Sequence, residues 1–183
     1  MPLVDAGSSG ARMTSTSVFS QLPLDQLEEA AGELQRRAGS ALRRIGEARA
    51  DDPGPEGDSP RERVATLIAS SELAIATFAA AAAGLEPPRE RLDRAPIAIA
   101  ALIYGAPTLT GLLGRLEQNR RALASLARHL EPRLGEATNS AWGDRSLREI
   151  LVLHAIEEPA RCAQSFEAAL AAIEAESPDA AAT

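Results

Sequence analysis

A leucine repeat over residues 109–130 constrains the fold of this chain more than any other feature. Its apolar positions recur every three or four residues, the pattern of a helix with one face buried in a helical bundle. Asn119 falls on the same seam, where a buried asparagine usually fixes packing or register. The segment predicts a core helix that opens at Thr108 or Thr110 and stops at Pro132. The leucines of the repeat are Leu109, Leu112, Leu116, Leu123, Leu126 and Leu130.

Three more amphipathic segments, separated by turn-rich breaks, predict helices over about 24–50, 60–84 and 147–175. The last two each follow a capping-box sequence, Ser59–Glu62 and Ser146–Glu149. The predicted fold class is all-α, an up-and-down four-helix bundle with a longer crossover between the second and third helices.

The remaining segments are assigned by their composition. The apolar stretch 97–105 lies within the crossover and is either a short helix or a buried extended segment. Residues 21–176 are expected to form the single helical domain. We expect residues 1–20 and 177–183 to be disordered.

Composition narrows the possible functions. All 19 basic residues are arginine, yet the net charge is −7, which argues against a general nucleic-acid surface. A single cysteine excludes an internal disulfide, and no apolar run is long enough to cross a membrane. The N-terminal residues lack the charged start and apolar core of a signal peptide. We therefore expect a cytoplasmic protein that binds neither nucleic acid nor a membrane.

The last predicted helix carries the candidate site in the stretch HAIEEPARCAQ, residues 154–164. His154, Glu158 and Cys162 are four residues apart, a spacing that places them on one helix face among apolar positions. Imidazole, carboxylate and thiolate suit a divalent metal such as zinc or nickel. Pro159 should bend the helix and free the carbonyl of Ala155. The alternative is ordinary core, with a hydrogen-bonded histidine and a cysteine acting as a small apolar side chain.

Two long stretches resemble the DinB/YfiT-like superfamily. They are TLTGLLGRLEQNRRALASLARHLEP and WGDRSLREILVLHAIEEPARCAQSFEAAL, and RERVATLIASSELA is similar to the family's second-helix motif. The resemblance covers roughly residues 24–175 and implies a four-helix bundle, often dimeric. Many members hold a divalent metal with one histidine from the second helix and two from the last. Some use a low-molecular-weight thiol in transferase or isomerase reactions.

The resemblance also implies that the metal site is degenerate. The family's second-helix histidine falls on Leu67, which cannot bind a metal. A further ligand would have to come from elsewhere, with Glu72, Asn119 and His129 as the nearest candidates. A pocket is expected between the second and last helices, beside the three candidate metal ligands. Its expected lining residues are Leu67, Ser71, Glu72, Asn119 and Trp142.

Two functions follow from these expectations. The first is a homodimeric bundle that has lost the metal and binds a small molecule or a partner, with a role in stress responses as the family name suggests. The second is a divalent-metal-dependent enzyme, of the thiol-dependent transferase or hydrolase type, that uses a variant site on the last helix. The sequence leaves the enzyme question open.

Overall fold

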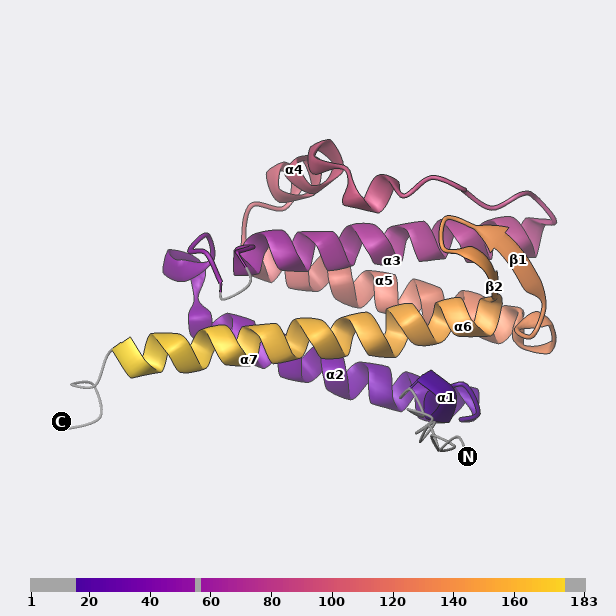
Figure 1. The fold of residues 1–183 in the computed structure, drawn as a ribbon, viewed down its shortest axis with the longest axis horizontal. Helices are drawn as coiled ribbons and strands as arrows, with labels where there is room; N and C mark the ends of the chain where they lie inside the picture. The colour runs from indigo at the N-terminus through magenta and orange to yellow at the C-terminus, as the bar shows by residue number, and fades with distance from the viewer. Residues whose placement is uncertain (1–15, 55–56, 177–183) are drawn as a thin grey trace, which may run out of the picture.

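The computed structural model describes residues 16–54 and 57–176 and shows the predicted all-α bundle (Figure 1). Three of its long helices are α2 (Leu24–Ile45), α3 (Pro60–Ala83) and α5 (Leu109–His129). The fourth is continuous but mixed: α6 (Leu147–Val152), a π turn (Leu153–Glu157) and α7 (Glu158–Glu176). Within the segment expected to be disordered, Thr16–Phe19 form the short helix α1. Residues 1–15 and the C-terminal tail, 177–183, lie outside the described residues.

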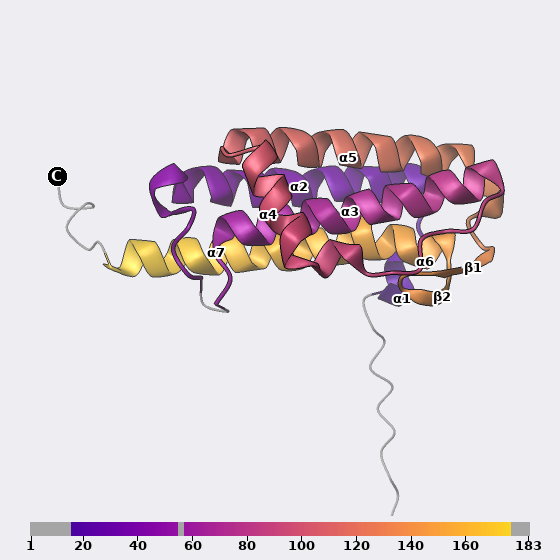
Figure 2. The ribbon, with the colours of Figure 1, turned by 90° about the horizontal axis from the view of Figure 1, so that it is seen from above.

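The long crossover between α3 and α5 sets the order of the helices in space. It returns along the outside of the bundle, so α3 and α5 point the same way, with α2 and α7 both pointing the opposite way (Figures 1 and 2). α2 lies along α7, and α3 lies along α5. The segment 97–105, left open by its sequence, lies within α4 (Pro96–Gly105), a helix that crosses α3 near the start of α5 (Figure 2).

The first long helix ends at Ile45, earlier than the predicted Ala50. Gly46 takes a positive φ of 77°, which stops the helix, and a 3-10 turn over Glu47–Arg49 follows. The buried Arg61 then joins this turn to the start of α3, with contacts of 2.9 Å to Glu47 and 2.8 Å to Asp51. These contacts hold the residues after the helix against the start of α3.

Three local predictions on helix starts are confirmed. Ser59 and Ser146 each form a complete capping box, at the starts of α3 and α6. Thr108, rather than Thr110, caps α5 by accepting a hydrogen bond from the Gly111 amide. The connection between α5 and α6 contains an antiparallel hairpin of β1 (Ala137–Ser140) and β2 (Gly143–Ser146). Gly143, at a φ of 81°, supplies the tight turn that no helical pattern predicts.

Pro159 perturbs the last helix by widening it. The amide of Glu158 donates to the carbonyl of Leu153, five residues back, in place of the usual four. The π turn therefore ends at Glu157, two residues before Pro159, which has no amide to donate. The extra residue in this turn changes which side chains share a face on either side of it.

The apolar core consists of two clusters, one toward each end of the bundle. Phe166 and Phe78 are fully buried and belong to the two clusters, respectively.

Among the described residues, α3 is the one helix long and apolar enough to cross a membrane, although α4 and α5 would also pass as a single segment bent by 110°. Because 61% of the apolar window in α3 is buried inside the bundle, its hydropathy matches that of a central core helix.

Candidate functional site

His154 lies at the centre of a small polar network inside the bundle. Its side chain is completely buried, and its Nδ1 is 2.9 Å from Oε2 of Glu158 and 3.4 Å from the hydroxyl of Ser70. No hydrogen bond joins these two side chains at Oε2, because this oxygen of Glu158 has no hydrogen-bond partner. Burial raises the pKa of Glu158, but His154, Ser70 and Arg161 outweigh burial, so the carboxyl titrates below its usual range. Glu158 is therefore ionised at neutral pH.

The crossover and the hairpin cover this network from outside. Trp142 meets the His154 ring edge-on, with the ring centroids 4.5 Å apart. Arg91 lies 5.5 Å from the centre of the Trp142 ring and binds Asp93 through two hydrogen bonds of 2.8 and 2.7 Å. Burial raises the pKa of Asp93, but Arg91 and Ser70 overcome this and hold it below its usual value. The network thus links the crossover, the hairpin, α3 and the last helix.

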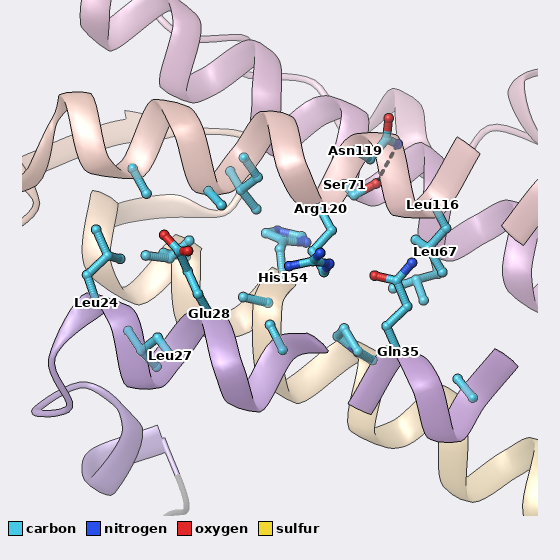
Figure 3. Close-up of a pocket in the computed structure, with 18 residues that line it drawn as sticks. Leu24, Leu27, Glu28, Gln35, Leu67, Ser71, Leu116, Asn119, Arg120 and His154 are labelled. Atoms are coloured by element: carbon cyan, nitrogen blue, oxygen red, sulfur yellow. Dashed lines mark hydrogen bonds between the residues drawn. The ribbon is translucent and has the colours of Figure 1, made fainter. Parts of the chain in front are cut away.

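A narrow crevice lies on the inner side of His154, between α2 and α5 (Figure 3). Its volume is about 50 Å³. Apolar side chains such as Leu27 and Leu123 form most of its walls, and Figure 3 shows Glu28, Arg120 and His154 pointing into it. It is the more enclosed and more apolar of the two hollows beside the network.

A wider polar cleft lies on the other side of the network, between α3, α7 and the crossover. Its volume is about 460 Å³. Glu158 and Cys162 line it, while His154 lines the crevice. The π turn separates the two positions, so the four-residue spacing does not place all three candidate ligands in one hollow. Four arginines also line the cleft: Arg63, Arg91, Arg94 and Arg161.

The residues present do not fit a bound metal. Within residues 16–54 and 57–176, no group of three or more His, Cys, Asp and Glu side chains is arranged to hold a metal ion. Burial raises the pKa of the Cys162 thiol to about 12, so in the metal-free protein this thiol is protonated at neutral pH. Leu67, at the position of the family's second-helix histidine, is buried and borders both hollows.

The structure divides the expected pocket residues between different places. Leu67, Ser71 and Asn119 line the crevice, and the Asn119 amide donates to the Ser71 hydroxyl at 2.8 Å. This bond ties α5 to α3, the packing role expected for an asparagine on the seam. Glu72 instead binds Arg115 at 2.6 Å and faces a shallow depression beside α4. Trp142 lines neither the crevice nor the cleft and contacts His154 directly.

Several residues of the site were not identified from the sequence. Arg91 and Asp93 belong to the predicted crossover, for which no site residue was expected, and Ser70 is one position from the expected Ser71. Their roles depend on the crossover folding back over α3 and α7. A charged pair two residues apart inside a proline-flanked connection is the one signal that could have marked them.

Comparison with known proteins supports the fold. The structure is similar to the crystal structure of a mycothiol-dependent maleylpyruvate isomerase, with a TM-score of 0.66 and 19% sequence identity. The alignment covers 82% of this chain and 63% of the isomerase, so this chain spans less than two thirds of that protein. The two proteins thus share an all-helical fold. No family model matches the sequence, and no curated protein sequence matches it.

Proposed function

We propose that this protein is a DinB-like bundle without a resident metal that binds a small organic anion in the polar cleft. The observation that carries the proposal is the charge of the cleft. Its four arginines face three acidic residues, Asp58, Asp93 and Glu158, so four positive charges exceed three negative ones. In a chain with a net charge of −7, this is a local reversal of sign.

The arginines of the cleft divide into structural and available groups. Arg91 is held by Asp93 and stacks over Trp142, so it forms part of the wall. The Arg94 side chain makes no ion pair or hydrogen bond to the described part of the chain. Arg161 is exposed and donates only its Nε, at 3.4 Å, to the carbonyl of Glu157. Guanidinium groups bind carboxylates through paired hydrogen bonds, so Arg94 and Arg161 suit a carboxylate ligand.

The likeness to a known enzyme supports a small-molecule site on this fold. The similar structure is named as a thiol-dependent isomerase, so the same bundle can accommodate a small substrate. The hollow in this chain lies against the last helix, and a buried ionised Glu158 forms part of its floor. A cleft of about 460 Å³ is the size of an ordinary small-ligand site.

Calorimetric titration with succinate tests the proposal, with the neutral 1,4-butanediol as the matched ligand control. We expect saturable binding of succinate and none of the diol. Arg161→Gln should weaken succinate binding about tenfold, roughly 1.4 kcal/mol. Arg145→Gln removes the same charge from the hairpin, outside the cleft, and should leave the affinity unchanged. Equal loss in both variants, or no binding to the wild type, would refute the proposal.

One observation favours the second function, a divalent-metal-dependent enzyme. His154 and Glu158, two of the candidate ligands, do contact each other at the border of the cleft. Their contact gives a metal at most a partial set of ligands, because no third ligand joins them among the described residues. A thiol-dependent transferase or hydrolase reaction therefore remains a prediction, as do the homodimer and the role in stress responses.

A further inference from the structure

The helix α4 carries an apolar stripe on the outer surface of the bundle (Figure 1). Ile97, Ala100, Ala101 and Tyr104 form the stripe, and all four residues are exposed. Their spacing places them on one face of the helix, opposite the buried Leu102. Ile97 is 80% exposed and Tyr104 is 90% exposed. A helix face with this apolar pattern is normally buried against another element.

The stripe belongs to a larger apolar patch. Five large apolar side chains are exposed in the described part of the chain, and Leu92, Ile97 and Tyr104 are three of them. Leu92 borders a depression of about 370 Å³ beside the stripe, together with Ala98 and Ala101. The exposed apolar side chains are therefore gathered in one place, which is the mark of an interaction surface.

The order of side chains along the stripe suits a second copy of this chain. A large residue stands at each end and two alanines lie between them, so the stripe is similar in both directions. If two α4 helices pair antiparallel about a two-fold axis, Ala100 and Ala101 of both copies meet at the axis and let the backbones approach closely. Ile97 of each copy then packs against Tyr104 of the other. The depression beside Ala98 leaves room for that tyrosine ring.

The exposed area is sufficient for such a contact. Leu92 is 59% exposed, and with Ile97 and Tyr104 it presents on the order of 400–500 Å² of side-chain surface. A symmetric pair therefore buries roughly 800–1,000 Å² before the alanines are counted, which is near the lower limit for a specific interface. An interface of this size corresponds to a reversible dimer with a Kd on the order of 10 μM.

The charge of the chain argues against a membrane as the occupant of the stripe. Helices that lie on membranes carry basic residues beside their apolar face, and these residues attract anionic lipids. α4 has no charged side chain, and the whole chain has a net charge of −7, which anionic headgroups repel. An uncharged stripe, in contrast, lets two acidic copies meet without bringing their charges into contact.

We propose that the protein forms a two-fold symmetric dimer through α4, with the two helices antiparallel. This surface lies on the crossover, and none of the four stripe residues lines the polar cleft. The dimer therefore does not depend on the anion proposed for the cleft.

Sedimentation velocity of the full chain, from about 1 to 100 μM, tests this dimer. We expect a monomer–dimer equilibrium that strengthens with added sodium chloride, because salt screens the repulsion between two acidic copies. Ile97→Glu should weaken the dimer at least about tenfold, because each copy then buries an unpaired carboxylate. Leu85→Glu is the matched control and should leave the affinity unchanged, since Leu85 is 67% exposed and lies outside the patch. Circular dichroism verifies that both variants fold.

A second substitution tests the antiparallel geometry. Tyr104→Arg alone should also weaken the dimer. The double variant Ile97→Glu/Tyr104→Arg should associate at least about threefold more tightly than Ile97→Glu, because the new carboxylate of each copy faces the new guanidinium of the other. The two positions are seven residues apart, about 10 Å along the helix, so these charges meet only between copies.

Four results would overturn the proposal. The first is a wild type that remains monomeric at about 100 μM, well above the expected Kd. The second is equal association of Ile97→Glu and Leu85→Glu, and the third is a double variant that associates no better than Ile97→Glu. The fourth is binding of the wild type to phosphatidylcholine vesicles that is lost in Ile97→Glu, which would assign the stripe to a membrane.

Discussion

Single residues behave differently here from what their spacing along the helix suggests. His154 was expected to be either a metal ligand or a hydrogen-bonded core residue, and its Nδ1 does face Glu158 and Ser70. Cys162 is buried and borders the cleft without joining His154. The sequence identifies the chemical groups, but only the structure shows which hollow each one faces. Burial, which spacing does not report, then decides their reactivity.

At this scale we predict that Cys162 of the folded protein is inert toward thiol reagents. With a pKa of about 12, about one thiol in ten thousand is ionised at pH 8. Reaction with Ellman's reagent at pH 8 should therefore be negligible until denaturant is added, and should then be complete. Rapid stoichiometric reaction of the native protein would contradict the burial of this thiol.

The same pKa shift has a consequence for stability. The folded pKa of Cys162 lies above its ordinary value of 9.0, because burial disfavours the thiolate. The stability that this group contributes is thus fully present below pH 9 and is lost as the pH rises from about 9 toward 12. Cys162→Ala should flatten this part of the stability profile.

The π turn is the element that the sequence only partly predicts. Pro159 indicated a defect in the last helix, and a defect is present. A proline in the sequence does not show whether the helix will kink or widen, because the outcome depends on how the neighbouring helices pack against it. The wider turn changes the direction in which side chains after it point relative to those before it. His154 therefore lines the crevice and Glu158 lines the cleft. Helical periodicity alone predicted that His154, Glu158 and Cys162 share one helix face. In the structure these residues line two different hollows.

We predict that Pro159→Ala increases the stability of the protein. A proline inside a regular helix costs about 3 kcal/mol, and the π turn recovers part of this by pairing Glu158 with Leu153. The variant regains an amide donor, so the free energy of unfolding in urea should rise by about 1 kcal/mol. Pro60→Ala is the matched control, because a proline in the first turn of α3 loses no helical bond and its replacement should bring no gain. Loss of stability in Pro159→Ala would show that the proline itself holds the turn.

At the scale of the whole molecule, the fold follows from the sequence more closely than the site does. Four periodic segments, two capping boxes and one long break were enough to predict a bundle with a long crossover. The path of that crossover could not be predicted, because it depends on Arg91 and Asp93 reaching the network around His154 and Trp142. Neither periodicity nor composition records such contacts. The cleft is thus formed by tertiary contacts and could not be predicted from the sequence.

The metal content of the protein tests the central claim most directly. Untagged protein purified without chelator, then exposed to excess zinc or nickel and dialysed, should contain far less than one metal ion per chain. His154→Ala should retain the same background amount, because the described residues offer no grouped ligands. One ion per chain in the wild type, lost in His154→Ala, would contradict a metal-free bundle and would establish the variant metal site on the last helix.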